Sequence, residues 1–260
     1  MTAAPPPLPS KSTTQGSLRS SDPFGSTLPG YMPKAGDVIA GKYQVDHKLG
    51  EGAMSVVFQV THRVTQKRFA LKWLLPHVCA RPELAQRFLR EAQVAGRVEH
   101  PHLVEVYDVG SLEGSFYMVL ELLRGESLEQ RLTRVGRMSP ADSLRLLLPC
   151  LRGIAAAHEA GIVHRDLKPA NIFVCSAAST AAEHAKVLDF GISKLPNLPG
   201  DTRSALTRTG LVMGTPRYMP LEQMRGKPID QRADIYALGV VLYQMLSGRL
   251  PYPQNNFGDL

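Results

Sequence analysis

The residues from Val163 to Val174 read VHRDLKPANIFV and combine a carboxylate, two cations and an amide in one short segment. Asp166 can accept a proton from a hydroxyl group, and Lys168 can neutralise a phosphoryl group during its transfer. The side-chain amide oxygen of Asn171 can bind Mg²⁺. These residue types at this spacing predict a loop that transfers a phosphoryl group. The alternative is a solvated loop that precedes a short apolar strand at Ile172–Val174.

Two upstream segments could hold phosphate groups. In LGEGAMSVVFQV at Leu49–Val60, Gly50 and Gly52 can bring backbone N–H groups close to phosphates because glycine has no Cβ. A simple turn would also explain these glycines. In RFALKWLL at Arg68–Leu75, the alternation of residue types predicts a half-buried strand that carries Lys72 towards the same phosphates. A solvated lysine at a strand edge is the alternative.

Two further carboxylates lie in elements that could place them nearby. The segment Glu83–His100 has apolar residues at helical spacing after Pro82, and it contains Glu91. A helical glutamate is usually solvated, so Glu91 could also be a surface residue. In KVLDFGISK at Lys186–Lys194, Asp189 follows an apolar strand, where it could bind Mg²⁺ or serve only in a turn.

The order of these segments along the chain resembles the protein kinase family, and within it the bacterial Ser/Thr kinases of eukaryotic type. The resemblance implies an α+β fold of two lobes, with a small antiparallel-sheet lobe at about 37–120, a hinge at 121–125 and a helical lobe at 126–260 that lacks its last helices. It also implies that the chain uses ATP with Mg²⁺ or Mn²⁺ and acts on Ser or Thr hydroxyls of protein substrates.

The family pattern assigns a role to each matching residue. Lys72 is expected to pair with Glu91, while Asn171 and Asp189 hold the metal ion. The third glycine of the family's loop is replaced here by Ser55. The residues expected to bind ATP are Gly50, Glu51, Gly52, Ala53, Val57, Ala70, Lys72, Glu91, Glu121, Leu123 and Phe173.

The segment that begins at Asp189 resembles an activation loop. Arg165 precedes the proposed base and is expected to help bind a phosphate on this loop. Thr207 and Thr209 match threonines that similar bacterial kinases phosphorylate on themselves, which also suggests a homodimer for phosphorylation in trans. Thr215 is expected to bridge Asp166 and Lys168 and to complete the catalytic set.

Composition is compatible with a globular protein but would not identify it. The 260 residues are 43% hydrophobic and 20% charged, and the formal net charge is +7. The basic residues are scattered, so we expect no nucleic-acid partner. Three cysteines without paired spacing suggest the cytoplasm. The Pro- and Ser-rich segment Met1–Gly36 is expected to be a disordered tail, and no stretch is apolar enough to cross a membrane.

In the helical lobe, Ser139 and Pro140 predict the start of a helix that continues to about Ala160. A second helix near Asp234 is expected to brace the backbone of the phosphoryl-transfer loop. The chain stops at Leu260, before the family's last helices. We therefore expect Glu222 to lack its usual partner, apolar helix faces to be uncovered and stability to be low unless a partner or a dimer covers them.

Three functions remain open from the sequence. The first is an ATP-dependent Ser/Thr protein kinase, which the complete set of chemical groups favours. The second is a truncated kinase-like scaffold or decoy that binds nucleotide without turnover. The third is a small-molecule kinase, such as those acting on aminoglycosides or choline, which Lys168, Thr215 and the long activation loop disfavour.

Overall fold

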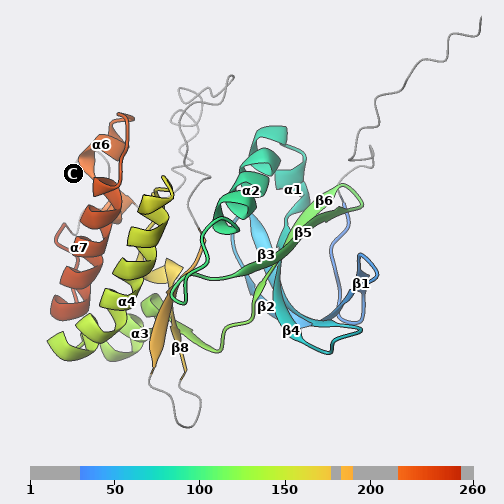
Figure 1. Cartoon of the computed structure of the whole chain (residues 1–260), viewed down its shortest axis with the longest axis horizontal. Helices are drawn as coiled ribbons and strands as arrows, with labels where there is room; N and C mark the ends of the chain where they lie inside the picture. The colour runs from blue at the N-terminus through green and yellow to red at the C-terminus, as the bar shows by residue number, and fades with distance from the viewer. Residues whose placement is uncertain (1–29, 177–182, 190–215, 253–260) are drawn as a thin grey trace, which may run out of the picture.

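The computed structural model describes residues 30–176, 183–189 and 216–252, which form a strand-rich small lobe and a mainly helical large lobe (Figure 1). The small lobe contains a six-stranded antiparallel sheet in the order β1-β2-β3-β4-β6-β5. Its strands are β1 Val38–Ile39, β2 Tyr43–Glu51, β3 Ser55–His62, β4 Arg68–Leu74, β5 Val106–Leu112 and β6 Ser115–Glu121.

Two helices connect β4 to β5, namely α1 Pro76–Cys79 and α2 Pro82–Ala95. α2 begins with Pro82 in its first turn and buries Ala85, Phe88 and Ala92 against residues of β4 and β6. It ends at Ala95, whereas the predicted helical segment continued to His100. The α2 face that packs on the sheet is the one that carries Glu91.

Residues 30–36 belong to the segment that the sequence assigned to a disordered tail, and for these residues the prediction was wrong. The ring of Tyr31 lies edge-on to Trp73 with 5.6 Å between the ring centroids. The Tyr31 hydroxyl also donates a hydrogen bond to Asp37 at 2.6 Å. Because Tyr31 and Met32 pack on the sheet core, burial of their side chains compensates the entropy of ordering this segment.

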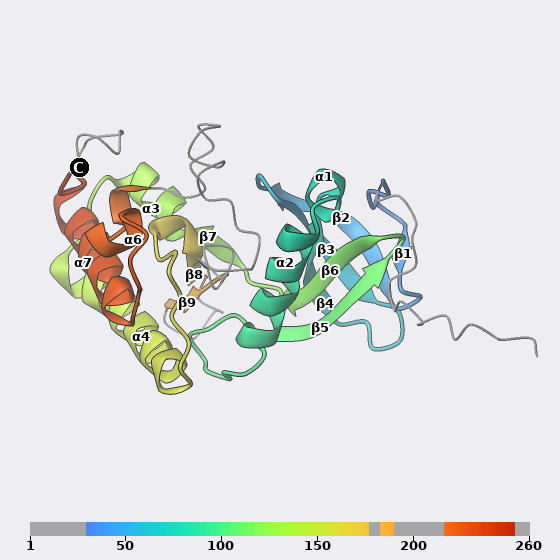
Figure 2. The same cartoon turned by 90° about the horizontal axis from the view of Figure 1, so that it is seen from above.

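The large lobe combines helices with a three-stranded antiparallel sheet in the order β7-β8-β9. Figure 2 shows its long helices gathered on the side away from the six-stranded sheet. Its elements are β7 Gly125–Ser127, α3 Leu128–Val135, α4 Pro140–Glu159, the 3₁₀ turn η1 Pro169–Asn171, β8 Ile172–Cys175, β9 His184–Val187, the 3₁₀ turn η3 Pro216–Tyr218, α6 Leu221–Met224 and α7 Arg232–Ser247.

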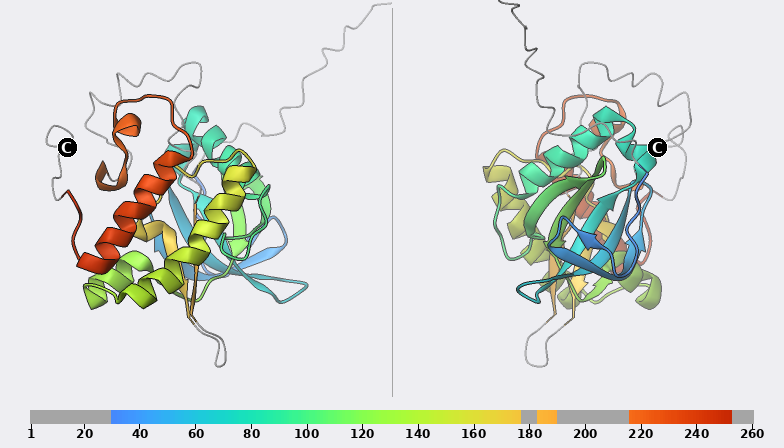
Figure 3. Two further views of the ribbon diagram at one scale, coloured as in Figure 1. Left: turned by 60° about the vertical axis from the view of Figure 1, so that its left-hand side comes forward. Right: turned by 90° about the vertical axis from the view of Figure 1, so that its right-hand side faces the viewer.

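The helix predicted after Ser139 is α4, and the Ser139 side chain caps it by accepting a hydrogen bond from the backbone N–H of Asp142. Apolar side chains of α4, α7, β8 and β9 form one core cluster. The two long helices are prominent in Figure 3. This core fixes the segment between α4 and β8, which contains Asp166, Lys168 and Asn171, against the start of α7.

Part of the outer surface of the large lobe is apolar, as expected from the sequence. On α7 the exposed apolar residues are Ile235, Tyr236, Tyr243 and Leu246, and on α4 they are Leu144 and Leu148. Glu222, for which the sequence predicted a missing partner, lies partly buried in α6. Within the described residues, no helix is both long enough and apolar enough to span a membrane.

Candidate active site

A buried carboxylate at the start of α7 holds the phosphoryl-transfer loop. Asp234 is 1% exposed and accepts hydrogen bonds from the backbone N–H groups of His164 and Arg165, each at 2.8 Å. Its carboxylate also lies 2.8 Å from Nε2 of His158 on α4. Two neighbouring backbone donors that point at one carboxylate fix the loop in a single conformation, as the sequence predicted for Asp234.

His164 joins this loop to the segment that carries Asp189. Its Nε2 lies 2.9 Å from the carbonyl oxygen of Leu188, and its Nδ1 accepts a hydrogen bond from the backbone N–H of Asp166 at 3.2 Å. Complete burial lowers the pKa of His164, so the ring is neutral with its proton on Nε2. A neutral ring in this tautomer ties the two segments together without adding charge.

The three polar residues predicted for phosphoryl transfer lie together. Nζ of Lys168 is 3.2 Å from Oδ2 of Asp166. The side-chain Nδ2 of Asn171 donates to the backbone oxygen of Asp166 at 2.8 Å and to its Oδ2 at 3.2 Å. This orientation turns the amide nitrogen of Asn171 towards Asp166, so the amide oxygen is the atom of this side chain that could bind a metal ion, as the sequence predicted.

Lys72 joins the two lobes at the same place. Its Nζ lies 3.0 Å from Oε1 of Glu91 on α2, which is the pair that the sequence predicted, and 2.7 Å from Oδ1 of Asp189. Burial opposes the charged ammonium group, but the carboxylates of Asp189 and Glu91 hold the pKa of Lys72 above its ordinary value. Lys72 is therefore a fixed cation between α2 and the large lobe.

Asp189 differs from Glu91 in exposure and in backbone conformation. The Asp189 side chain is 43% exposed, whereas that of Glu91 is 12% exposed. Asp189 also has a positive φ of 41°, which costs energy for a residue other than glycine and is typical of functional positions. The more exposed carboxylate is the one able to bind a metal ion while Glu91 stays with Lys72.

The glycine-rich loop between β2 and β3 has space where side chains would normally be. A Cβ added to Gly50 would meet no atom within 4 Å, and one added to Gly52 would meet only the backbone oxygen of Ser55 at 3.8 Å. The loop is closed by a hydrogen bond from the Gly52 N–H to that oxygen at 2.8 Å. Packing within the protein does not require glycine here, whereas close approach of a phosphate to the backbone does.

These groups line one cavity of about 260 Å³ between the lobes. The predicted site residues that line it are Gly52, Ala53, Lys72, Glu91, Asp166, Lys168, Asn171 and Asp189. The cavity therefore joins the proposed base, the cations and the metal-binding oxygens in one space. Its lining excludes the predicted adenine-binding residues Val57, Ala70, Glu121, Leu123 and Phe173, as well as Gly50 and Glu51.

The residues predicted to bind the adenine ring lie outside the lining of this cavity. Ala70 is buried in the same apolar cluster as Leu120, with Val57 and Leu123 packed against it. No hydrogen bond within the described part of the chain uses the backbone N–H of Leu123. Phe173 is partly exposed between two buried residues of β8, so its ring faces away from the core of the large lobe.

The predicted regulatory residues are only partly described. Arg165 is half-buried with a positive φ of 67°, and its backbone oxygen accepts a hydrogen bond from Gln223 Nε2 at 2.9 Å. Burial lowers the pKa of the Arg165 guanidinium. Thr207, Thr209 and Thr215 lie outside the described residues.

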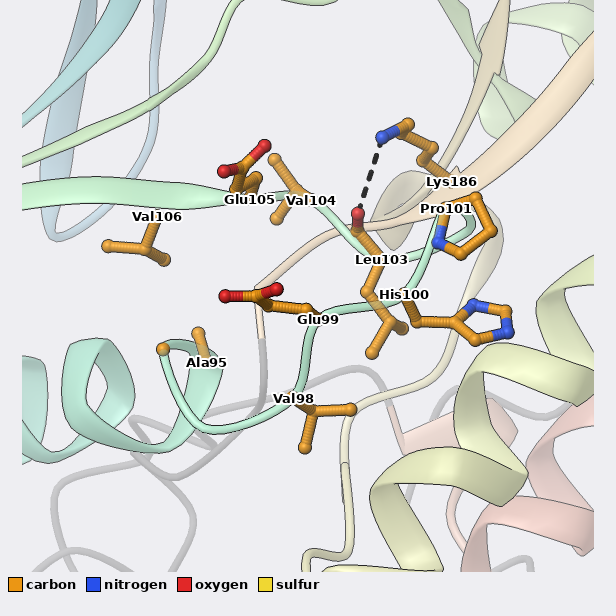
Figure 4. A pocket seen from close by; sticks show the side chains of 11 residues that line it. Ala95, Val98, Glu99, His100, Pro101, Leu103, Val104, Glu105, Val106 and Lys186 are labelled. Atoms are coloured by element: carbon orange, nitrogen blue, oxygen red, sulfur yellow. Dashed lines mark hydrogen bonds between the residues drawn. The ribbon is translucent and has the colours of Figure 1, made fainter.

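A second cavity, of about 360 Å³, lies along the segment that joins α2 to β5 (Figure 4). Lys186 of β9 borders it and donates to the backbone oxygen of Leu103 at 3.5 Å and to the Glu121 carboxylate at 2.6 Å. Glu99 and Glu105 also line it, but none of the predicted site residues does. Since the groups for phosphoryl transfer line the other cavity, that one is the candidate active site.

The sequence analysis missed one charged residue in the candidate active site. Arg87 of α2 lines the cavity and is only 6% exposed. It lies four residues before Glu91, so the two side chains share one face of the helix. The available signal was a charged residue on a helix face that also carries the apolar Leu84 and Phe88.

A family model described as "Protein kinase domain" matches residues 43–259. The chain belongs to the protein kinase family. The two-lobed α+β fold predicted from the sequence is confirmed by this match and by the arrangement of the two sheets and the helices. In this family the domain uses ATP and a divalent metal ion.

Relatives of this kinase domain include bacterial proteins. It is 39% identical over 219 residues to "Probable serine/threonine-protein kinase PknB" of Corynebacterium glutamicum, covering 83% of this chain and 33% of the relative. It is 40% identical over 222 residues to "Serine/threonine-protein kinase pkn3" of Myxococcus xanthus, covering 85% and 40%. The kinase domain thus spans well under half the length of these relatives.

A solved structure shows the same fold. The crystal structure of the Mycobacterium tuberculosis PknI kinase domain matches this kinase domain with a TM-score of 0.67 and 29% sequence identity. The match covers 85% of this chain and 80% of the solved one.

The residues of the kinase domain fit the nucleotide and the metal ion that the family uses. The open space at Gly50 and Gly52, which a Cβ would enter, has the form that phosphates close to the backbone require. Among the described residues, no group of three His, Cys, Asp or Glu side chains could hold a metal ion. Mg²⁺ does not need such a group, because one or two protein oxygens, water and phosphate oxygens can complete its coordination. Asn171 and Asp189 supply oxygens of the required kind.

Proposed function

We propose that this kinase domain transfers the γ-phosphoryl group of ATP to Ser or Thr hydroxyls of proteins. The observation that carries the proposal is the meeting of two groups of residues in one cavity. Lys72 and Glu91 reach it from the small lobe, while Asp189, Asp166 and the neighbours of Asp166 reach it from the large lobe. Charged groups fixed before the reaction stabilise the developing charge without reorganisation.

Each side chain has a defined task in this proposal. Asp166 accepts the proton of the attacking hydroxyl, and Lys168 at 3.2 Å from its carboxylate balances negative charge on the phosphoryl group. Lys72 binds phosphate oxygens while Glu91 keeps it in place. Asn171 and Asp189 hold Mg²⁺, which supplies charge neutralisation of the phosphates when bound.

Ser or Thr as the acceptor, rather than a small molecule, is supported by the names of the relatives, all of which describe Ser/Thr protein kinases. Thr215 would contact Asp166 and Lys168 and complete the acceptor side of the site. We further propose that Thr207 and Thr209 are phosphorylated by a second copy of the chain. Arg165 would then bind the phosphate that this reaction adds.

The cytoplasm is the compartment that this proposal favours. The three cysteines, Cys79, Cys150 and Cys175, are free rather than paired in disulfides. Unpaired thiols are typical of a reducing compartment, where ATP is also available.

Intact-mass and peptide mass spectrometry after incubation with Mg-ATP test the proposal. The purified chain is incubated with a generic basic substrate protein, beside the Asp166→Asn variant. We expect added phosphate on Ser or Thr of the substrate, and on Thr207 or Thr209, only with the unmodified chain. A folded chain that binds ATP but adds no phosphate would instead favour the nucleotide-binding scaffold.

A further inference from the structure

Lys186 of β9 connects two segments that lie far apart in the sequence. Its Nζ lies 2.6 Å from Oε2 of Glu121, the last residue of β6, and 3.5 Å from the backbone oxygen of Leu103, in the segment that joins α2 to β5. Figure 4 shows the second of these contacts. The Lys186 side chain is only 12% exposed. A lysine with so little access to water is rarely found unless it is paired, so the contact with Glu121 holds both side chains in place.

This ion pair links the two lobes. On one side, Val187 of β9 accepts a backbone hydrogen bond from Val104 at 3.0 Å and donates one to the oxygen of His102 at 2.8 Å, which fixes the segment before β5 to the large lobe. On the other side, Glu121 ends a strand of the small-lobe sheet and begins the hinge that the sequence predicted. Lys186 therefore holds the start of the hinge against the large lobe.

On the large-lobe side, Lys186 lies beside Phe173, one of the residues predicted to bind adenine. The two residues are direct partners across β8 and β9, and each stands between buried neighbours on its strand. Direct partners in an antiparallel pair point to the same face of the sheet. Phe173 and Lys186 therefore share the face that is turned away from the large-lobe core.

On the small-lobe side, Glu121 is close to Ala70, another residue predicted to bind adenine. Leu120 and Glu121 of β6 are the partners of Ala70 and Phe69 of β4. The ion pair thus joins the strand pair that carries Ala70 to the sheet face that carries Phe173. The contact at 2.6 Å limits how far these two surfaces can separate.

We propose that Lys186 is a positioning residue for the base of ATP, because its ion pair with Glu121 sets the gap between the surfaces that receive the adenine ring. This inference rests on the proposed function, since it places ATP between the lobes. A flat ring is held by contacts on both of its faces, and a gap that widens by even a fraction of an ångström loses part of the attraction on one side. Lys186 therefore acts on the base through Glu121, whereas Lys72 acts on the phosphates.

The test measures two affinities by isothermal titration calorimetry. The purified chain is titrated with Mg-ADP, and the affinity for adenosine, which has the base but no phosphate, is obtained by competition against Mg-ADP. The variants are Lys186→Met, Glu121→Gln and the double variant. Arg131→Gln is the matched control, because it removes an ion pair of similar exposure, 16% and 31%, with Glu183, the residue before β9. Urea unfolding verifies that each variant is folded.

We expect Lys186→Met to weaken Mg-ADP and adenosine by the same factor, at least about fivefold, as is typical when two contacting residues are uncoupled. Glu121→Gln keeps the backbone of the hinge and should cause the same loss. The double variant should bind no more than about twofold more weakly than either single variant, because the ion pair can be lost only once. Arg131→Gln should leave both affinities unchanged.

Several results would overturn the role of Lys186. Unchanged adenosine affinity in Lys186→Met would do so, and so would losses in the two single variants that add in the double variant. Weakening of Mg-ADP without weakening of adenosine would assign Lys186 to the phosphates instead. Equal weakening by Arg131→Gln would show that any loss of stability has this effect. If Lys186→Met does not fold, Glu121→Gln decides the matter, since unchanged adenosine affinity in that variant overturns the proposal.

Failure of this inference is distinguishable from failure of the proposed function. An unmodified chain that is folded but binds neither Mg-ADP nor adenosine contradicts the proposed function, and the inference with it. Normal binding of both by the unmodified chain, with the same affinities in Lys186→Met, contradicts only the role of Lys186.

Discussion

Replacing Asp234 with Asn should loosen the loop that carries Asp166, although Asp234 itself does not line the nucleotide cavity. Oδ2 of Asp234 accepts from the His164 N–H and lies 2.8 Å from Nε2 of His158, while Oδ1 accepts from the Arg165 N–H. An Asn side chain has one oxygen in place of two. Whichever way it turns, its NH₂ group faces at least one N–H donor.

The cost of Asp234→Asn follows from these contacts. At least one hydrogen bond to a charged acceptor is lost, which contributes about 1.5–3 kcal/mol, and the remaining bonds lose their charge assistance. Since the side chain is 1% exposed, water cannot replace the lost partner. We therefore expect unfolding free energy to fall by about 2–4 kcal/mol, a large part of the about 5–15 kcal/mol that stabilises a typical domain.

Urea unfolding and single-turnover phosphoryl transfer measure the two consequences of Asp234→Asn. The urea midpoint should fall, and the transfer rate should drop by about a hundredfold, as expected for a base displaced by about 1 Å. Nucleotide affinity should stay within about twofold, because Lys72 and Glu91 do not contact Asp234. Asp230→Asn, at an exposed aspartate before the same helix, is the control and should leave all three quantities unchanged. An unchanged urea midpoint and rate in Asp234→Asn would refute the reasoning.

Three further predictions concern other contacts. Lys72→Met should reduce the affinity for both ATP and ADP by at least about tenfold in calorimetry, because it removes a cation held by two carboxylates; equal affinity would contradict the assignment. Gly50→Val should leave the urea midpoint nearly unchanged, since a Cβ there meets no atom within 4 Å, but it should weaken nucleotide binding. Loss of stability without loss of binding would contradict the prediction that this loop holds phosphates. The hydrogen bonds from Arg131 lower the pKa of Glu183, so this pair stabilises the fold above the ordinary pKa of a glutamate and loses its effect as pH falls through the lowered value. Arg131→Gln should therefore cost about 1–2 kcal/mol at pH 7 and progressively less as the pH of the urea titrations is lowered below the ordinary pKa of a glutamate, and a cost that does not change with pH would contradict this.

The sequence predicted the polar centre of the site because its groups are close in the chain. Asp166, Lys168 and Asn171 lie within one short segment, so their meeting depends on one loop conformation. The contact between Lys72 and Glu91 depends on how a helix packs on a sheet, and only the family pattern made it predictable. The contact itself is present at 3.0 Å.

Other features depend on packing between distant segments and were not predicted. In the sequence Arg87 is an ordinary basic residue of a helix, and only the packing of α2 against the sheet brings it into the cavity. The segment 30–36 contains two glycines and a proline and has no periodic apolar pattern, but Tyr31 packs against Trp73 on the sheet. In both cases, local propensity carries no information about the distant partner.

Transfer of a labelled γ-phosphate from ATP to peptides that differ only in Ser, Thr or Tyr at one position tests the central claim most directly. We predict that the purified chain labels the Ser and Thr peptides and that Asp166→Asn reduces this rate by at least about a hundredfold, because the base is lost. Equal labelling by the Asp166→Asn variant, or no labelling by a chain that binds Mg-ATP, would contradict the account.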